Sequence, residues 1–417
     1  MSSFSIALSG LSASSDALNI ISNDLANLNT VGFKDQEASF SDLFYQNLGT
    51  NGSGDPIEEG LGTQIGSVST NFAVGGTVQQ TGVPSNVAIT GNGFFIAQAP
   101  NGDLSYTRAG NFGVNTEGEL VTNSGATVLG YPAVNGVVNT GGGLGGLYVG
   151  SNLVSPPSAT TTMQMQTNLN ADAGTGGTFS TPMTVYDSLG NSHILSVNFT
   201  QTATGTWGYQ VTLPAADTGG TGNPTVVASG TMTFDGNGNL TAPTGSIAIQ
   251  IPGLADGAST MNVTWNLTSN TGTPLITQLA SQSATSAVNE NGYANGTLQS
   301  YLVGPDGTIQ GTFSNGQTQA LGQIALANFA NDQGLESAGN NSYTPTLASG
   351  AAVVGVPNAG GLGTLTGGAL EMSNVDISSE FTNLIVIQRG FEANARMITT
   401  LDSIESTTTN LQAQPGN

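Results

Sequence analysis

Between Val375 and Leu411 the chain reads VDISSEFTNLIVIQRGFEANARMITTLDSIESTTTNL, and this stretch decides the fold. It contains no proline and one glycine, Gly390, in a chain that has 60 glycines. Its apolar residues recur at intervals of three and four, as in a helix that packs against other helices. This stripe consists of Ile377, Leu384, Ile387, Phe391, Ile398 and Leu401. Ser373 with Asp376 three residues later predicts where the helix starts.

The first thirty residues carry a matching pattern. Their stripe consists of Phe4, Leu11, Leu18, Ile21, Leu25 and Leu28, with Ser14 as a gap. An isolated helix of this kind is marginal in water. On pattern alone it can equally be an amphipathic helix that lies on the core of its own domain. Because both ends of the chain carry such a stripe, we favour a helical core that is shared between copies.

The charge balance limits the partners of the protein. The 417 residues include 26 acidic and 4 basic side chains, which gives a net charge of −22. Four cations cannot build a phosphate-binding surface, so we expect no nucleic acid partner. An anionic bilayer would also repel the chain. No apolar run approaches the length of a membrane span, and the N-terminus lacks the basic region of a Sec signal peptide. We therefore expect no membrane insertion.

The chain has no cysteine and one histidine, His193. This composition excludes disulfides, cysteine-bearing zinc sites and multi-histidine metal sites. His193 follows an apparent turn, so we expect a solvent-exposed loop histidine and not a member of a catalytic triad. The stretch that begins at Asp235 resembles half a calcium loop but lacks its closing acid, which favours a hairpin tip. We expect no catalytic, cofactor-binding or metal site, and no enzyme.

The middle of the chain has the signals of strands. Asn-Gly and Asp-Gly pairs recur between runs rich in β-branched residues, and Asn-Gly predicts type I′ hairpins because both turn positions need positive φ. If the two terminal helices pair, the intervening parts are nested. We thus expect a helical core (1–30 and 372–417), connectors (31–70 and 360–371), an inner β domain (71–145 and 285–359) and an inserted outer β domain (146–284). The fold class is mainly β, of barrel or sandwich type, with a coiled-coil-like pair of terminal α-helices.

Several stretches resemble one known family. Residues 26–34, ANLNTVGFK, resemble the signature that follows the first helix in bacterial flagellar rod and hook proteins. Residues 91–96 and 106–112 resemble the β core of these subunits, and residues 367–376 and 388–395 resemble their C-terminal signature. The matches follow the family's order from end to end. The residues of these motifs that we single out are Asn27, Gly32, Phe33, Lys34, Arg108, Asn374 and Asn394.

The length of the chain favours the hook members of this family. Rod subunits are similar but lack the large inserted domain, whereas residues 185–191 and 321–335 resemble hook subunits. The resemblance implies a structural subunit that polymerises into a curved, flexible tube and transmits torque as a universal joint. The twelve stripe positions would then form the polymer core. One alternative is a distal-rod subunit, and another is a secreted β-rich enzyme or adhesin with helical ends.

The resemblance also implies partners and a location. A hook subunit is part of a homopolymer of many copies and meets rod proteins, hook-filament junction proteins and the hook cap. It leaves the cell through the flagellar type III export apparatus and lies outside the cell in the flagellum, with no cofactor. Export by that route agrees with the missing Sec signal.

Overall fold

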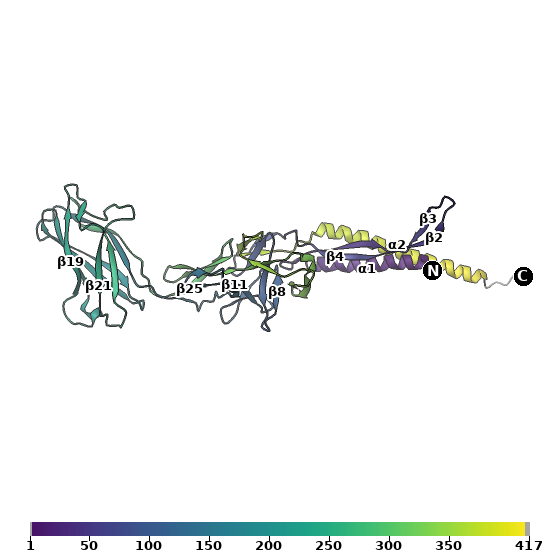
Figure 1. Cartoon of the computed structure of the whole chain (residues 1–417), viewed down its shortest axis with the longest axis horizontal. Helices are drawn as coiled ribbons and strands as arrows, with labels where there is room; N and C mark the ends of the chain where they lie inside the picture. Colours follow the sequence, from purple (N-terminus) through teal and green to yellow (C-terminus); the bar gives the residue numbers. More distant parts are fainter. Residues whose placement is uncertain (1, 413–417) are drawn as a thin grey trace. The chain divides into compact units, whose positions relative to one another are not determined.

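The computed structural model describes residues 2–412 and divides the chain into two compact units, an inner and an outer one (Figure 1). The inner unit comprises Met1–Ser151, Ser300–Gly311 and Thr318–Asn417, and the outer unit comprises Asn152–Gln299 and Thr312–Gln317. The described chain is mainly β with one helix near each end, which confirms the predicted fold class. The outer unit extends to Gln299, whereas the sequence had suggested 146–284 for the inserted domain.

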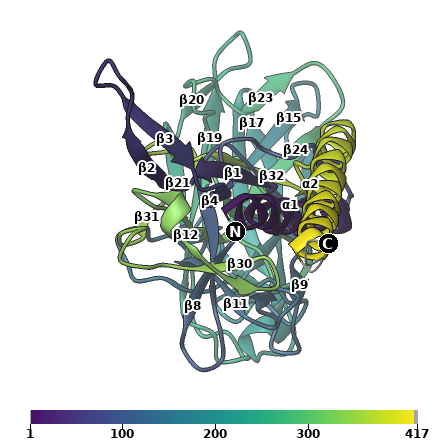
Figure 2. The same cartoon turned by 90° about the vertical axis from the view of Figure 1, so that its right-hand side faces the viewer.

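The two helices are α1 (Ser2–Ala26) and α2 (Ile377–Gln412), and they lie side by side (Figure 2). Helix α1 ends four residues before the expected position 30. Asp376 is the residue that caps α2, because its Oδ1 accepts hydrogen bonds from the amides of Ser378 (2.8 Å) and Ser379 (2.9 Å). A carboxylate at this position also favours the helix N-terminus electrostatically.

The hydropathy of α1 corrects one expectation. By length and composition, Phe4–Ala26 is apolar enough to cross a membrane, with a mean hydropathy of 1.2. The sequence reading had found no run of that length because serine and asparagine interrupt the apolar residues. A helix packed on its own protein passes the same test, and α1 packs on α2 and on β4 (Thr63–Thr70).

Both segments that we expected to be connectors contain strands. In the first segment, β1 (Gln36–Asp42) pairs with β4, and β2 (Tyr45–Thr50) pairs with β3 (Pro56–Gly60). In the second, β32 (Thr364–Gly367) pairs with β6 (Val87–Thr90). The sequence pattern did not reveal these strands because they are filled with polar residues and glycine. Backbone hydrogen bonds and not an apolar face define them.

The inner unit is built around a sheet whose central strands are β7 (Phe94–Gln98) and β11 (Thr127–Val134). The remaining strands of this unit are β5 (Val78–Gln80), β8 (Leu104–Thr107), β9 (Gly113–Val114), β10 (Leu120–Val121), β12 (Val137–Val138), β13 (Gly145–Gly146), β27 (Thr318–Ile324), β28 (Leu326–Asn328), β29 (Glu336–Gly339), β30 (Ser342–Thr344), β31 (Val353–Gly355) and β33 (Ala369–Glu371). Two further strands, β25 (Gly296–Val303) and β26 (Thr308–Phe313), continue into the outer unit. Phe94 and Phe95 are fully buried and belong to two separate apolar clusters, one on either face of β7.

Only some of the Asn-Gly hairpin turns are of the predicted type I′. Asn135-Gly136 has positive φ at both residues (52° and 76°), as a type I′ turn requires. At Asn101-Gly102 and Asn315-Gly316 only the glycine has positive φ. These hairpins therefore use turns in which a single left-handed residue, glycine, is enough.

The outer unit is a sandwich of two five-stranded sheets around one core. One sheet contains β15 (Thr162–Asn170), β21 (Ser246–Ile251), β22 (Met261–Asn266), β23 (Ile276–Leu279) and β24 (Ala284–Glu290). The other contains β16 (Thr178–Tyr186), β17 (Ser192–Ala203), β18 (Thr206–Leu213), β19 (Thr225–Phe234) and β20 (Leu240–Ala242). Trp207 and Trp265 come from opposite sheets, and both are completely buried in the shared core.

The position of His193 contradicts the sequence reading. His193 is buried and lies on β17 opposite Val185 of β16, and is not in a solvent-exposed loop. The turn before it ends at Asn191, and from Ser192 the chain alternates between the exposed and the buried face. His193 takes a buried position in that alternation.

Candidate functional site

Small residues form the buried face of α1. Gly10 lies so close to α2 that a Cβ atom added to it would be 2.7 Å from the side-chain nitrogen of Asn394. Ser14, which the sequence reading treated as a gap, is buried and faces Gly390 of α2. The buried positions of α1 are Ala7, Gly10, Ala13, Ser14, Ala17, Ile21 and Asp24. Small side chains at the contact allow two helices to approach closely.

The predicted stripe residues lie mostly beside this contact and not in its centre. Ile21 is buried, whereas Phe4 and Ile377 are 46% and 47% exposed. The other nine predicted positions are half-buried: Leu11, Leu18, Leu25, Leu28, Leu384, Ile387, Phe391, Ile398 and Leu401. A single chain thus leaves much of their apolar surface uncovered. That they are buried between copies stays a prediction.

Helix α2 exposes a second set of apolar side chains. Phe381, Ile385, Val386, Met397 and Ile404 are each between 49% and 61% exposed. The apolar pattern of the sequence extends to Met397 and Ile404, where the stripe shifts by one residue, but it does not include Phe381, Ile385 or Val386. Exposed large apolar side chains on one helix are typical of an interaction surface, which is proposed for α2 below.

A buried ion cluster anchors the segments that join the helices to the inner β unit. Lys34 Nζ lies 2.7 Å from Glu371 Oε1, and Arg108 Nη1 lies 3.6 Å from Glu371 Oε2. Lys34 also donates to the carbonyl of Val74 (2.9 Å), and Arg108 donates to that of Gly91 (2.8 Å). The cluster therefore ties the chain after α1 to the chain before α2.

Burial acts against the charge of both cations in this cluster. It lowers the pKa of Lys34 and of Arg108, while the Glu371 carboxylate beside them raises both pKa values and opposes that effect. Removing one partner of a buried ion pair is costly, because it leaves the other charge buried without compensation. The cluster thus fixes the geometry at the base of the two helices.

Two of the motif residues shape the same joint. Gly32 has φ +68°, and a Cβ atom there would be 2.6 Å from the backbone of Arg108, so only glycine fits. Its amide donates to the carbonyl of Glu371 (2.7 Å). Asn374 accepts a hydrogen bond from the Asp35 amide (2.8 Å) and donates to the Asp35 carboxylate. These hydrogen bonds therefore join the motif that follows α1 to the motif that precedes α2.

The other motif residues lie on or near the helices. Asn27 donates to the carbonyl of Asn23 (2.9 Å) and accepts from the Thr30 hydroxyl (3.0 Å), which closes the C-terminal end of α1. Phe33 is half-buried and lines a hollow beneath that end. Asn394 covers Gly10.

Asp24 is a carboxylate buried beside this joint. Its Oδ2 accepts a hydrogen bond from the Gln36 amide (2.9 Å), while its Oδ1 has no hydrogen-bond partner among the described residues. Burial raises the pKa of the Asp24 carboxyl to about 6, and the nearby Glu380 and Asp35 act in the same direction. The sequence reading did not single out Asp24, because an acid in a polar-rich helix normally faces solvent.

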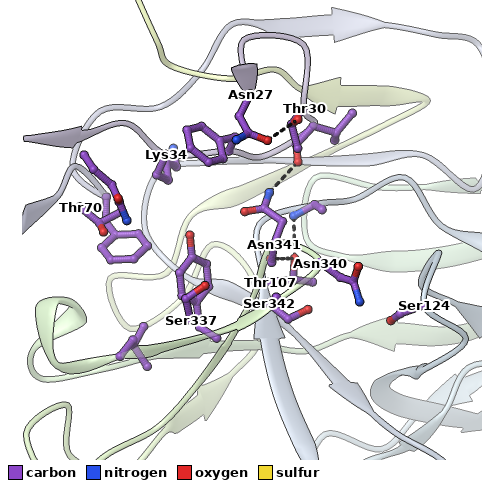
Figure 3. A pocket seen from close by; sticks show the side chains of 18 of the residues that line it. Asn27, Thr30, Lys34, Thr70, Thr107, Ser124, Ser337, Asn340, Asn341 and Ser342 are labelled. Atoms are coloured by element: carbon purple, nitrogen blue, oxygen red, sulfur yellow. Dashed lines mark hydrogen bonds between the residues drawn. The ribbon is translucent and has the colours of Figure 1, made fainter. Parts of the chain in front are cut away.

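A hollow of about 810 Å³ lies beneath the end of α1 (Figure 3). Apart from Lys34, whose amine is bound to Glu371, its lining consists of amides, hydroxyls, aromatic rings and aliphatic groups. Asn341 donates across it to the carbonyl of Val31 (2.7 Å), and Thr107 donates to the carbonyl of Asn341 (2.7 Å). These groups can form hydrogen bonds to a polypeptide backbone, but they do not pair a general acid with a general base.

Four family descriptions match successive parts of the chain. They are "Flagella basal body rod protein" over residues 4–34, "Flagellar hook protein FlgE/F/G D1 domain" over 88–168, "Flagellar basal body protein FlaE D2 domain" over 152–293 and "Flagellar basal body rod FlgEFG protein C-terminal" over 366–411. The chain is 37% identical to the flagellar hook protein FlgE of Escherichia coli K12 over 98% of its own length and 100% of that protein. The chain belongs to the flagellar hook protein family.

Other relatives agree with this family over almost the whole chain. The flagellar hook protein FlgE of Salmonella typhimurium is 38% identical, covering 98% of this chain and 100% of that protein. The FlgE of Treponema pallidum is 34% identical, covering 97% and 98%. The structure of the Helicobacter pylori flagellar hook protein FlgE2 matches with a TM-score of 0.50 and 16% identity, covering 70% of this chain and 100% of that one. At this identity the match to FlgE2 supports the fold alone.

Proposed function

We propose that this chain is a structural subunit of the bacterial flagellar hook and polymerises through α1 and α2. The observation that carries the proposal is the incomplete burial of both helices in a single copy. Relatives that match over their full length are named flagellar hook proteins, which supports the same function.

Polymerisation follows from the surfaces of the two helices. Their half-buried leucines and Phe391, together with the exposed set on α2, are covered when copies pack side by side. Contacts that repeat head to tail without closing give a helical tube. The buried ion cluster of Lys34, Arg108 and Glu371 holds each pair of helices on its β unit while the tube transmits torque.

The β units then lie outside the helical core and supply the flexibility of the tube. Their contacts between copies are sparsely charged, so they can slide as a curved tube rotates. Cryo-electron microscopy of a bent tube measures these contacts along its short and long sides. Identical outer contacts on both sides would contradict sliding.

Partners and location follow from this function. Rod proteins, hook-filament junction proteins and the hook cap are its neighbours at the two ends of the tube. The subunit leaves the cell through the flagellar type III export apparatus and assembles outside the cell. The terminal helices, which are marginal alone, suit export of an unfolded chain.

A distal-rod subunit is the second candidate. Its support is that the descriptions matching both ends of the chain name rod proteins. The full-length matches to hook proteins and the additional match over 152–293 favour the hook.

Electron microscopy after salting-out tests both functions. We expect curved tubes from the full chain, and no tubes from chains that lack residues 2–26 or 377–412. Straight tubes would favour the rod. Tubes formed without either helix would overturn the proposed assembly.

A further inference from the structure

The histidine of the chain lies among carboxylates in the outer unit. His193 is on β17, and Asp187 lies in the turn that connects β16 to β17. Asp217 lies in the short 3₁₀ helix η1 (Ala215–Thr218), and Asp256 lies in the loop between β21 and β22. Three separate loops therefore bring carboxylates to one imidazole ring.

The distances match those of a metal-binding group. His193 Nε2 lies 3.2 Å from Asp187 Oδ2 and 3.6 Å from Asp256 Oδ2, and the three atoms all lie within 4.8 Å of one another. Oxygen and nitrogen ligands bind a transition metal ion at about 2.0–2.2 Å, which places ligand atoms about 3–3.5 Å apart. The separations of His193 Nε2 from the two carboxylate oxygens are therefore those of ligands that share one metal ion.

Asp217 orients the ring for this role. Its Oδ2 lies 3.1 Å from His193 Nδ1, on the far side of the ring from the other two carboxylates. When the N–H group at Nδ1 donates a hydrogen bond to Asp217, Nε2 carries no proton, and its lone pair points towards Asp187 and Asp256. This arrangement of carboxylate, histidine and metal is the usual support of a metal-bound imidazole.

Carboxylates make up most of the polar side chains around His193. Three carboxylates surround one imidazole, and Asp187 is completely buried. Asn191, another side chain that contacts both Asp187 Oδ2 (3.3 Å) and Asp256 Oδ2 (3.0 Å), is a neutral amide and brings no positive charge.

We propose that His193, Asp187 and Asp256 bind a divalent transition metal ion of the Zn²⁺ type, with Asp217 as the positioning residue. Imidazole nitrogen suits Zn²⁺ and its neighbours in the first transition row, whereas Ca²⁺ and Mg²⁺ prefer oxygen ligands alone. The ion joins the turn after β16 to the loop between β21 and β22, and so links the two sheets at one end of the sandwich. The sequence reading excluded multi-histidine sites but did not weigh one histidine with two aspartates.

The chain contains a matched control for the buried aspartate. Asp187 Oδ1 accepts from the amides of Leu189 (2.8 Å) and Asn191 (2.9 Å). Asp235 Oδ1 accepts in the same way from Asn237 (2.9 Å) and Asn239 (2.8 Å). Only Asp187 has His193 beside its second oxygen. Asp235→Asn therefore tests the loss of the turn hydrogen bonds alone, whereas Asp187→Asn also removes the proposed metal ligand.

Calorimetric titration of the chelator-treated full chain with Zn²⁺ tests the proposal. We expect one saturable site in the wild type and in Asp235→Asn, and its loss in Asp187→Asn and His193→Gln. Asp217→Asn is expected to weaken Zn²⁺ binding by about 10–100-fold. A large excess of Ca²⁺ is expected to leave the Zn²⁺ affinity unchanged.

Asp256→Asn provides the decisive variant if the buried substitutions prevent folding, because Asp256 lies in an exposed loop. We expect visible absorption from Co²⁺ bound to the wild type and its loss in Asp256→Asn, with unchanged circular dichroism. No saturable site in the wild type, or Zn²⁺ binding that persists in both His193→Gln and Asp256→Asn, would overturn the proposal. Displacement of Zn²⁺ by Ca²⁺ would overturn the assignment to a transition metal.

Discussion

The outer β sandwich and the pair of terminal helices bury their side chains to very different degrees. Strands β16, β17 and β18 bury alternate residues, and both tryptophans of the outer unit are completely covered. Within α2, no side chain described between Ile377 and Thr409 is buried, although the helix lies along α1. One region thus has a complete core in a single copy and the other does not.

This difference indicates where the stability of each region comes from. The sandwich buries apolar surface within itself, which is the dominant favourable contribution to folding. A helix gains most of its stability from packing of its apolar face, and α2 has only part of that face covered. Variants in the two regions should therefore affect different measurements.

Phe391→Asp should have the largest effect and abolish assembly. It places a charge on the half-buried face of α2, where packing between copies would remove it from water. We expect no sedimentable polymer after salting-out, and unchanged thermal unfolding of the outer unit. Val226→Asp, at an exposed site on β19, is the control and should still form tubes. Polymer formation by Phe391→Asp would contradict the idea that neighbouring copies complete the burial of α2, and with it the contrast between the two regions.

Trp265→Ala should destabilise the outer unit by about 3–5 kcal/mol, because it opens a large cavity in a closed core. Urea unfolding followed by the fluorescence of Trp207 measures this loss. Ile194→Ala, at an exposed site on β17, should change the free energy of unfolding by less than about 0.5 kcal/mol. Similar effects of the two variants would mean that the core of the sandwich is not complete.

Lys34→Met should destabilise the joint beneath the helices by about 3 kcal/mol, since it leaves buried Glu371 with Arg108 as its remaining cation. Hydrogen exchange at the Gly32 amide, which is bonded to the Glu371 carbonyl, reports on this region. Arg389→Met removes an exposed cation from α2 and should leave that exchange unchanged. If both variants behave alike, the cluster does not anchor the helices.

The smallest effect should be a pH dependence at Asp24. Its pKa is raised to about 6 in the folded chain, above the ordinary value of 3.8, so the folded state binds this proton more tightly. The contribution to stability is therefore complete below about pH 4 and is lost as the pH rises through 6. The free energy of unfolding, measured by urea denaturation between pH 4.5 and 7.5, should decrease with pH in the wild type. Asp24→Asn should remove most of this dependence, and an equal slope in both proteins would contradict it.

The sequence predicted the helices and the β class because both depend on local periodicity. Heptad spacing located α1 and α2, and alternation with Asn-Gly pairs located the β regions. The sequence did not predict that Gly10 and Ser14 lie in the contact face of α1. The small residues glycine, alanine and serine do not stand out in a pattern of large apolar side chains. Strands β1 to β4 were missed for a similar reason.

Contacts between distant residues were beyond the reach of local patterns. Lys34 and Glu371 are 337 positions apart, and both were visible only as members of separate motifs. His193 was misplaced because the turn before it suggested a loop, while two of its carboxylate partners, Asp217 and Asp256, lie on other loops. A cluster assembled from several loops needs the tertiary structure to be recognised.

The entry and exit strands of the sandwich have a consequence for how such proteins diversify. Val154 of β14 (Val154–Ser155) pairs with Thr297 of β25, so the chain leaves and returns at neighbouring positions. A domain with adjacent ends can be exchanged, enlarged or excised as a cassette without redirecting the rest of the polypeptide. Related chains can therefore vary this unit in size and surface while the rest of the chain stays the same.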